Sequence, residues 1–506
     1  MKYIALTLGP ITRTIEMAEN TRSLWAASYL FSYLGEKIIE PFIDREFLLP
    51  YIGKKMFEKN YKGAGVFPDR YIFKAEQGDF DKLSDHVKDV IHKLAIKIAD
   101  KIYYHEKEIE EYLRNYLKVY FFEKEFDISD EKVIKESCEK SLALLEMQDS
   151  VIPMVDDTKL FLNILFDRVT GSFLAKDAGI EKGFPTIVKI SSGDNVETPQ
   201  HPYQRYIAVV KADGDSMGKA FEKTNDANAL SEALFEFNTK AVEIIRNDFD
   251  GLPVFIGGDD LLFFAPIFTK NGSIFSLLQC LDTAFHESIS EKTDLKKQEE
   301  HPTLSFGVSV SYYKYPMFEA LELADNLLAK AKVGDGEKNN IVFSVLKHSG
   351  QTRAALLHKG NTETLEKFNS FMNDYMKKVE ETEDKKMLAS VMHGLREKEA
   401  LLSVAIKEKE TLKNFFDNNF NEDGHKEYGM FFEDLRGLLW ATYQAFSEPG
   451  KLDKIKDCLP QNMMVRNVNT EELIPTPEKV AIETAYNALQ FVHLVNQRND
   501  ERDESI

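Results

Sequence analysis

Two adjacent carboxylates lie at a predicted turn near the middle of the chain. The tetrapeptide Gly257-Gly258-Asp259-Asp260 separates two short apolar runs, residues 252–256 and residues 261–265. This pattern predicts two strands joined by a tight turn, because glycine supplies the positive φ angles that a two-residue hairpin requires. Adjacent aspartates repel each other and are not buried without compensation. A hard divalent cation, Mg²⁺ or Mn²⁺, would compensate them, since it prefers oxygen ligands and in turn holds nucleotide phosphates.

A second acidic motif, Asp213-Gly214-Asp215-Ser216-Met217-Gly218, follows a predicted buried strand at residues 206–212. If this strand and the hairpin are neighbours in one sheet, Asp213 faces Asp259 and Asp260 across the sheet edge. Three or four carboxylates at one place fit two Mg²⁺ ions about 3.5–4 Å apart, the arrangement that supports in-line displacement at phosphorus. One ion would lower the pKa of an attacking ribose hydroxyl. The other would neutralise the triphosphate and the departing pyrophosphate.

Each motif alone has an ordinary structural explanation. Gly-Gly-Asp-Asp forms hairpin turns with solvated aspartates, and Asp-Gly-Asp occurs in turns and at the start of calcium-binding loops. The calcium loop is disfavoured here, because the glutamate expected later in such a loop is missing and Ala220 and Phe221 do not suit it. Both motifs at strand ends, in this order, favour a nucleotide site. Gly214 and Gly218 would also let backbone N–H groups near a following helix start approach phosphate oxygens.

The composition is that of a multidomain globular protein. At 506 residues the chain is expected to form roughly three or four domains of about 100–200 residues each. No apolar run reaches the roughly 18 residues of a transmembrane helix, and residues 1–8 run directly into a strand-like segment without a signal-peptide cleavage site. Cys138, Cys280 and Cys458 are too far apart for a metal ribbon or a disulfide framework, which indicates a cytoplasmic protein.

The formal net charge of −20 restricts how the chain can meet nucleic acid. A protein that grips a nucleic-acid backbone alone over a long footprint is normally basic. The charge therefore argues against such a protein. It remains compatible with nucleic acid that is held mainly by partner subunits.

Hydrophobic periodicity divides the chain into an N-terminal part, a middle domain and a helical C-terminal part. The N-terminal part has predicted strands at residues 1–9 and 63–75. Its predicted helices are residues 11–39, 83–120 and 130–145. Prolines and small polar residues predict a linker at residues 185–203.

The middle domain has the predicted order βαββαβ of a ferredoxin-like fold. Its strands are residues 206–212, 252–256, 261–265 and 303–311, with helices at residues 227–248 and 274–288. A helix at residues 318–332 and a strand at residues 341–345 follow. Beyond Gly350 no strand is predicted, residues 365–446 are helical by periodicity, and the charged tail 496–506 is expected to fray.

The middle domain resembles the nucleotide-cyclase or palm-polymerase domain of the Gly-Gly-Asp-Glu-Phe diguanylate cyclases. Asp213-Gly214-Asp215 matches that family's first acidic strand end, and residues 257–260 match its signature hairpin. Residues 303–308, Thr-Leu-Ser-Phe-Gly-Val, resemble its next strand. Residues 324–332 resemble its last helix, whose final lysine contacts the triphosphate. The resemblance implies that Lys332 binds the triphosphate, whereas the ordinary alternative is a solvated lysine at a helix C-terminus.

Two differences within the hairpin indicate a subfamily. Position 260 is Asp instead of Glu, and position 261 is Leu instead of Phe. With residues 212–218, this variant resembles the large polymerase-like subunit of type III CRISPR effector complexes, the type III-B form in particular. Residues 8–11 and 21–30 are similar to the opening of that subunit's first palm-like domain. Residues 67–71 resemble its later strand, and residues 184–186 its join to the second palm.

The resemblance implies an α+β fold with two ferredoxin-like palm/cyclase domains, helical insertions and a helical C-terminal domain. We expect a first, degenerate palm-like domain at 1–80, with strands completed after the helical region, then a helical region at 81–184 and a linker at 185–203. The second palm/cyclase domain with the Gly-Gly-Asp-Asp motif is expected at 204–348, and the helical C-terminal domain at 349–506.

The resemblance also assigns roles to site residues. The expected catalytic residues are Asp213, Asp259 and Asp260, and the expected metal ligands are Asp213, Asp215, Asp259 and Asp260. The residues expected to contact the nucleotide are Gly214, Ser216, Met217, Gly218, Gly257, Gly258, Ser305 and Lys332.

The implied function is an RNA-activated nucleotidyltransferase of a type III-B CRISPR complex. It would use ATP and Mg²⁺ (or Mn²⁺), with other complex subunits, crRNA and target RNA as partners and no membrane. The product would be a nucleotide second messenger, either a cyclic oligoadenylate or an AMP conjugate of S-adenosylmethionine. A free-standing cyclase and a non-catalytic scaffold of an RNA-guided complex are the alternatives.

Several features of that family are missing from this sequence. No His-Asp dipeptide occurs, so we predict no DNase activity, and without the relatives' cysteine ribbon we predict no zinc. The first palm has no paired aspartates and is expected to be a structural partner of the second. Arg22 and Trp25 are candidates for contact with an RNA-bearing subunit, although Trp25 in an apolar helical stretch favours a core position. No histidine is assigned a catalytic role.

Overall fold

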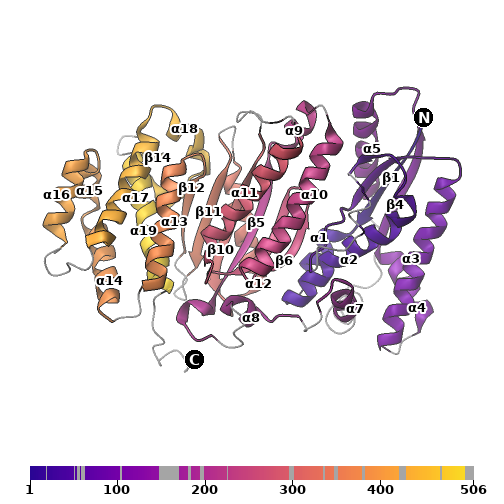
Figure 1. The fold of residues 1–506 in the computed structure, drawn as a ribbon, viewed down its shortest axis with the longest axis horizontal. Coiled ribbons are helices and arrows are strands. Elements are labelled where there is room, and N and C mark those ends of the chain that lie inside the picture. Colours follow the sequence, from indigo (N-terminus) through magenta and orange to yellow (C-terminus); the bar gives the residue numbers. More distant parts are fainter. Residues whose placement is uncertain are drawn as a thin grey trace.

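The computed structural model places three parts in a row along the longest axis of the molecule (Figure 1). A small sheet with its helices lies at one end, a six-stranded sheet lies in the middle, and the C-terminal helices lie at the other end. The structure describes residues 1–18, 20–50, 52–53, 57, 63–102, 105–147, 170–180, 184–193, 199–224, 226–293, 295, 301–333, 337–346, 352–378, 382–420, 429–467 and 470–495. The predicted tail 496–506 lies outside these residues.

The first sheet has the ferredoxin-like strand order β2-β3-β1-β4, with every neighbouring pair antiparallel. Its strands are β1 (Lys2–Gly9), β2 (Phe47–Leu49), β3 (Arg70–Lys74) and β4 (Lys118–Glu125). Its helices are α1 (Ile11–Glu16), α2 (Thr21–Ile39), α3 (Asp79–Ile102), α4 (Glu106–Tyr116) and α5 (Glu131–Glu146), with the short turn η1 (Glu40–Phe42). Strand β4 therefore completes the first sheet from within the region that was expected to be helical.

The single helix predicted at residues 11–39 is wrong, because the chain forms two helices there. Asn20 caps the second helix, since its side chain accepts a hydrogen bond from the Ser23 amide and the Ser23 hydroxyl accepts one from the Asn20 amide. This reciprocal capping box satisfies amides that a new helix start leaves without intrahelical partners. Apolar periodicity alone does not reveal such a break.

Helix α2 lies between the two sheets and is buried along nearly its whole length. Trp25 is fully buried on it, donates Nε1–H to the Gly63 carbonyl at 2.9 Å, and stacks on Tyr29 with ring centroids 4.9 Å apart. The core interpretation of Trp25 is therefore confirmed, and contact with an RNA-bearing partner is not possible for this buried ring. The same apolar cluster contains residues of both sheets, so the first two parts of the chain share a core.

The central sheet has the order β12-β11-β10-β5-β7-β6. Its strands are β5 (Tyr206–Asp215), β6 (Leu252–Gly257), β7 (Asp260–Pro266), β10 (Thr303–Tyr312), β11 (Asn340–Leu346) and β12 (Thr352–His358). Strands β10, β5, β7 and β6 with helices α10 (Ala227–Glu243) and α11 (Ile274–Lys292) form the ferredoxin-like βαββαβ unit. Helix α12 (Met317–Ala331) then leads to β11, which pairs parallel to β10.

Strand β12 contradicts the expectation that no strand follows Gly350. It pairs antiparallel to β11 at the edge of the central sheet, with Leu356 and Leu357 buried on opposite faces. Because both faces of this edge are covered, the strand lacks the alternation of apolar and polar residues that would have identified it. The two-stranded pair β13 (Met464–Arg466) and β14 (Leu473–Pro475) was missed as well.

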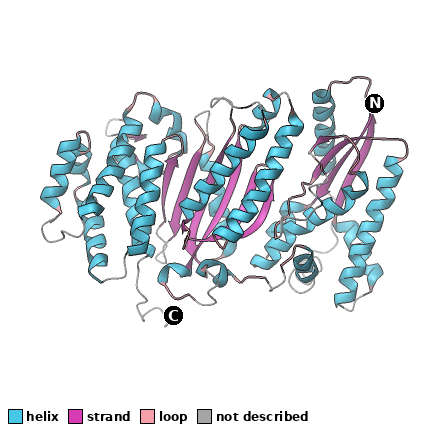
Figure 2. Cartoon of the chain, viewed as in Figure 1, coloured by secondary structure: helices cyan, strands magenta, loops and turns pink. Residues whose placement is uncertain are grey.

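Helices cover both faces of the central sheet (Figure 2). Helices α10 and α11 share one apolar cluster with one face of β5 and β10, and α12 and α2 share the other cluster with the opposite face. The short elements around this sheet are α7 (Thr170–Asp177), α8 (Ile187–Ser192), η4 (Pro202–Arg205), α9 (Met217–Lys223), the π-turn η5 (Ile244–Asp248), β8 (Phe268–Thr269) and β9 (Gly272–Ser273). Helix α8 and the start of η4 lie in the predicted linker, whose residues 194–198 are outside the described part.

The C-terminal part is helical, apart from the short β13–β14 pair, and packs on the β12 edge through α19 and α13. Its helices are α13 (Thr362–Lys378), α14 (Thr382–Glu397), α15 (Glu399–Ala405), α16 (Lys409–Asn419), α17 (Gly429–Ser447), α18 (Lys451–Ile455) and α19 (Pro477–Val495), with η8 (Lys456–Cys458) and η9 (Gln461–Met463). Two ferredoxin-like domains and a helical C-terminal part agree with the expected α+β fold class. No helix in the described residues is both long and apolar enough to cross a membrane.

The close packing of α12 on β10 gives a stability prediction at Gly307. A Cβ atom there would lie 2.3 Å from the Ala324 carbonyl oxygen and 2.3 Å from the Leu328 amide nitrogen, both of them backbone atoms of α12. We expect Gly307→Ala to lower the free energy of unfolding by about 1–3 kcal/mol or more, because the helix must move away from the sheet. Denaturant unfolding would measure the loss.

Ser309→Ala is the matched control for Gly307→Ala. Ser309 is fully buried on the same strand, and its hydroxyl has no hydrogen-bond partner in the structure. Removing an unpaired buried hydroxyl should change the free energy of unfolding by less than about 1 kcal/mol. Similar losses in the two variants would contradict the close approach of α12.

Candidate active site

Strand pairing brings the two acidic motifs to one edge of the central sheet. Strand β5 pairs with β7 up to Ala212 opposite Leu261, so that Asp213 and Asp260 continue the register as the next opposing pair. Directly opposed residues have Cβ atoms about 4.5–5.5 Å apart. Gly257 pairs with Asp260 to close the β6–β7 hairpin, and Gly258 takes the positive φ of 63° that its turn requires. The predicted hairpin and its position beside β5 are confirmed.

Asp259 packs directly against the backbone of β5. A Cβ atom on Gly214 would lie 2.6 Å from the Asp259 Cβ and 2.8 Å from the Asp259 Oδ2. The same added atom would lie 2.6 Å from the Cγ atom of Met217. The turn can therefore approach the strand this closely only because Gly214 has no side chain.

Asp213 lies between the other two aspartates. Desolvation, the negative charge of Asp213 and a hydrogen bond with that carboxyl raise the pKa of Asp259 to about 6. Desolvation and the charges of Asp213 and Asp259 also raise the pKa of Asp260, although part of its side chain faces solvent. A raised pKa in a carboxyl means that its negative charge is not fully compensated by the protein. This edge is therefore a place where a cation would be stabilising.

Lys332 provides the one cation that contacts these aspartates among the described residues. It follows the last turn of α12, and its ammonium group forms an ion pair with Asp213. The same group donates a hydrogen bond to the Gly214 carbonyl at 2.9 Å and lies 3.7 Å from the Asp215 Oδ1. The helix end thus delivers the lysine to the acidic edge, so the alternative of a solvated lysine is not what the structure shows.

Asp215 occupies a different environment from the other three aspartates. Its side chain is buried, and its Oδ2 accepts hydrogen bonds from the Thr303 hydroxyl at 2.8 Å, the Ser305 hydroxyl at 2.8 Å and the Asn339 amide at 2.9 Å. An oxygen with three donors has no lone pair left for a metal ion. The other oxygen, Oδ1, is buried without a hydrogen-bond partner among the described residues and lies 3.7 Å from the Lys332 ammonium group. The expected role of Asp215 as a metal ligand therefore rests on Oδ1 and stays a prediction, while Oδ2 holds β5, β10 and the Asn339 backbone together.

The remaining residues expected to contact a nucleotide fall into two groups. Ser216, Gly218 and Gly258 are exposed at the same edge, and Ser216 has a left-handed backbone with φ of 60° between β5 and α9. Ser305 and Met217 are buried. The Ser305 hydroxyl donates to Asp215 and supports that carboxylate, and its expected contact with a nucleotide stays a prediction.

Sequence reasoning missed Asn238, which contacts the hairpin turn from α10. In the orientation that matches its partners, its side-chain amide donates to the Gly258 carbonyl at 3.1 Å and accepts from the Gly258 amide at 3.0 Å. Its side chain is 2% exposed. A signal was present in the sequence, because Asn238 falls four residues after Leu234 on the apolar face of the predicted helix.

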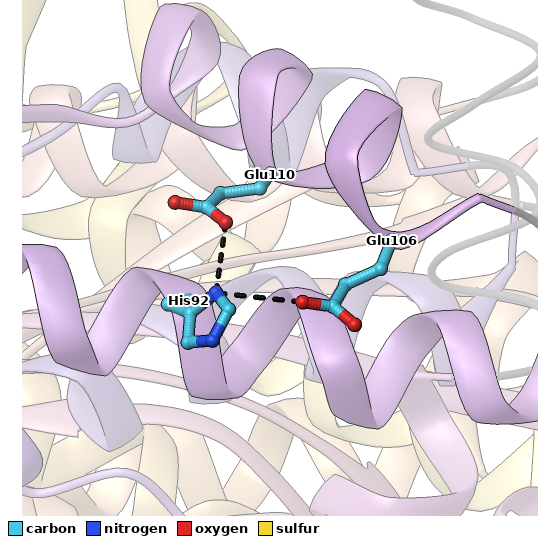
Figure 3. Close-up of side chains that lie close together, drawn as sticks. All are labelled: His92, Glu106 and Glu110. Atoms are coloured by element: carbon cyan, nitrogen blue, oxygen red, sulfur yellow. Dashed lines mark hydrogen bonds and ion pairs between the residues drawn. The ribbon is translucent and has the colours of Figure 1, made fainter.

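A second group of potential ligands lies in the first domain (Figure 3). Among the described residues, His92, Glu106 and Glu110 are the group whose ligand atoms all lie within 4.8 Å of one another. The His92 Nδ1 atom is 2.8 Å from the Glu110 Oε2 and 3.6 Å from the Glu106 Oε1. Arg114 also binds the Glu110 Oε1 at 2.8 Å through Nε. This partly exposed group links α3 and α4, and Arg114 supplies a cation beside Glu110.

Two family models match separate parts of the chain. The model described as Cas10/Cmr2, second palm domain, matches residues 206–342, which contain both acidic motifs and Lys332. The model described as CRISPR-associated protein Cmr2, N-terminal, matches residues 3–114. The CRISPR system Cmr subunit Cmr2 of Pyrococcus furiosus is 28% identical over 180 residues, which cover 33% of the chain and 18% of that protein. The match thus spans less than a fifth of the relative's length.

Solved structures of low sequence identity are similar in fold. A chain of the type III-B Cmr-beta complex in its apo state has a TM-score of 0.43 at 12% identity, with 70% of each chain covered. A chain of the Csm1–Csm4 cassette in complex with cA4 has a TM-score of 0.48 at 12% identity, covering 98% of this chain and 70% of that chain. A chain of the same cassette in complex with pppApApA has a TM-score of 0.49 at 12% identity, covering 98% of this chain and 69% of that chain. With TM-scores below 0.5, these likenesses carry no further conclusion.

The raised pKa of Asp259 predicts how stability depends on pH without divalent cations. Its carboxyl titrates near pH 6 in the folded chain but near 3.9 when unfolded, so the folded state holds the proton more tightly between these values. The contribution of Asp259 to stability is therefore largest below about pH 4 and is lost as the pH rises through about 6. In EDTA, the Tm of Asp259→Asn minus that of the wild type should increase between pH 4 and pH 7. A constant difference would contradict the shift.

The buried network of Asp215 predicts that Asp215→Asn and Asp213→Asn differ in their effects on stability. An asparagine at 215 can turn its amide oxygen to the three donors of Oδ2, but its amide nitrogen then takes the buried Oδ1 position beside the Lys332 ammonium group. A buried donor without an acceptor, next to a cation, should lower the free energy of unfolding by about 1–3 kcal/mol. At position 213, asparagine relieves repulsion with Asp259 and Asp260 while losing the ion pair to Lys332. We expect a loss below about 1 kcal/mol there. Denaturant unfolding without metal would compare the two, and equal losses would refute the different roles.

Proposed function

On the premise that the chain belongs to the Cas10/Cmr2 family, we propose that it is the nucleotidyltransferase subunit of a type III-B CRISPR complex. The observation that carries the proposal is the aspartate edge: Asp213, Asp259 and Asp260 meet where β5 ends and the β6–β7 hairpin turns, with Lys332 beside them. A protein that only shaped an RNA complex would have no reason to keep carboxylates whose charges are incompletely compensated.

The donor set at this edge fits divalent magnesium or manganese. Asp213, Asp259 and Asp260 offer carboxylate oxygens, the ligands that these hard cations prefer. They are the residues that would hold the metal, and Asp215 could add only its Oδ1 atom, because its Oδ2 atom already accepts three hydrogen bonds. When bound, the metal supplies activation of a ribose 3′-hydroxyl and neutralisation of charge on the triphosphate and the departing pyrophosphate.

Residues of the chain itself account for binding and orientation of ATP. Lys332 would bind the triphosphate, and its ion pair with Asp213 at the end of α12 supports this role. Gly258 and Gly218 leave the edge without side chains at exposed backbone positions, where phosphate oxygens can approach amides. Hydrogen bonds from Thr303 and Ser305 on β10 to Asp215 on β5 stabilise this edge.

We further propose that the enzyme acts within the complex. Other type III-B subunits, crRNA and target RNA are its partners, and capture of foreign RNA switches on the reaction. The product is a nucleotide second messenger made from ATP, either a cyclic oligoadenylate or AMP joined to S-adenosylmethionine. The net charge of −20 supports RNA contact through partner subunits, because the chain alone lacks the positive charge for a long RNA footprint.

Removal of two carboxylates tests the proposal. In the assembled complex with target RNA, Asp259→Ala with Asp260→Ala should reduce product formation from ATP by at least about 10³-fold, because the metal loses two of its ligands. Complex assembly should be unchanged, since both residues lie at a solvent-facing turn. Mass spectrometry of the product, with and without S-adenosylmethionine, measures the effect and identifies the product.

Asp85→Ala is the control for this double variant, because Asp85 is an exposed aspartate on α3 with only a surface ion pair to Lys88. It should leave product formation within about twofold of the wild type. Undiminished product from the double aspartate variant would refute the site. Absence of any product from the wild-type complex with bound target RNA would favour the scaffold instead.

A further inference from the structure

The hairpin turn that carries Asp259 has little support of its own. Gly258 is exposed, and an added Cβ atom there would meet no heavy atom within 4 Å. Glycine has more backbone conformational freedom than any other residue, so this turn is not stiffened by its own residue at 258. Metal ligands, however, must be held within a fraction of an ångström to bind well. Something outside the turn therefore has to fix its position.

Asn238 contacts the turn from the side of α10. Its amide nitrogen donates to the Gly258 carbonyl at 3.1 Å and its amide oxygen accepts from the Gly258 N–H at 3.0 Å. These two hydrogen bonds resemble the pair of hydrogen bonds that an opposed residue on a neighbouring antiparallel strand would make with Gly258. A single side chain thus holds the two peptide units on either side of Gly258, the second of which leads into Asp259.

The position of Asn238 on its helix indicates that its role is to bind Gly258 in the turn. It lies on the buried face of α10 between Phe237 and Ala241, and its side chain is 2% exposed. Burial of an amide costs free energy unless hydrogen bonds replace those with water, and a leucine would pack there without that cost. The benefit of an asparagine is therefore its two bonds to the turn.

We propose that Asn238 is a positioning residue for the metal-binding turn, an inference that rests on the proposed function. Asn238 touches neither metal nor nucleotide and acts through Gly258 on Asp259 and Asp260. Asp259 is held from the opposite side by its contact with Gly214, so the turn is fixed between β5 and α10. Residues that orient ligands in this way typically change metal affinity by about 10–100-fold when they are replaced.

The decisive variant is Asn238→Leu, which keeps the size of the side chain and suits the apolar surroundings. We expect its Tm to equal or exceed that of the wild type, because no buried polar group is left unpaired on the side chain. Mn²⁺ binding to the chain without nucleotide, followed by electron paramagnetic resonance of the free ion, should be weakened about 10–100-fold. Hydrogen exchange of the turn amides at Gly258 and Asp259 should become faster in the metal-free chain.

Two further variants complete the test. Asn238→Asp keeps the acceptor for the Gly258 N–H but sets a carboxylate against its carbonyl, and it should also weaken Mn²⁺ binding. Asn228→Ala is the matched control, an exposed asparagine in the first turn of the same helix, and it should change neither Mn²⁺ binding nor exchange of the turn. In the assembled complex, high Mg²⁺ should restore product formation by Asn238→Leu.

The outcomes separate this inference from the proposed function. Wild-type Mn²⁺ affinity and wild-type exchange of the turn in Asn238→Leu would overturn the inference while leaving the metal site intact. If the wild-type chain binds no Mn²⁺ and its complex makes no product, the proposed function fails and the inference fails with it.

Discussion

Repulsion among three carboxylates is the constraint on which the candidate site depends. Asp213, Asp259 and Asp260 come from two stretches of chain that meet because β5 and β7 are neighbours. Among the described residues, Asp213 is the one of the three that pairs directly with a cation, Lys332, whose charge also acts on Asp259 and Asp260. The raised pKa values of Asp259 and Asp260 are the consequence. A fold normally avoids such a cost, so its persistence at a sheet edge favours a bound cation as the missing partner.

Several neighbouring elements restrain these carboxylates and prevent them from moving apart. Gly214 lets Asp259 rest on β5, Asp215 ties β5 to β10 and to the backbone at Asn339, and Asn238 holds the turn from α10. The position of Lys332 depends in turn on α12, which packs so closely on β10 that only a glycine fits at position 307. The site therefore draws on strands and helices across the whole central domain, and preorganisation by these rigid elements is what a metal-dependent transfer requires.

The sequence revealed the parts of the site that depend on local pattern. Short apolar runs ending in Asp213 and in the Gly-Gly-Asp-Asp turn identified two strand ends, and the ferredoxin-like order placed them together. The sequence could not separate Asp213 from Asp215, because residues two apart share a strand face. Only the fold brings Thr303, Ser305 and Asn339 to one oxygen of Asp215. Strand β12 was missed because burial on both of its faces leaves no periodic signal. The break before α2 was missed because it depends on one capping side chain, which periodicity does not reveal.

The first domain offers an internal comparison, because it has the same strand order and the corresponding edge is built differently. There Thr7 on β1 is opposite Arg70 on β3, at the positions where Asp213 and Asp260 stand in the central sheet. Glu146 from α5 accepts a hydrogen bond from the Thr7 hydroxyl and pairs with Arg70 through two bonds, one of them 3.0 Å long. Glu146 at that edge thus meets a fixed cation within the protein, while burial raises the pKa of the neighbouring Asp69 carboxyl. The two domains therefore share a strand order but differ at this edge, because Asp213, Asp259 and Asp260 meet only in the central sheet. The structural role of the first domain and the catalytic role of the second stay predictions, and a shared fold alone would not decide them.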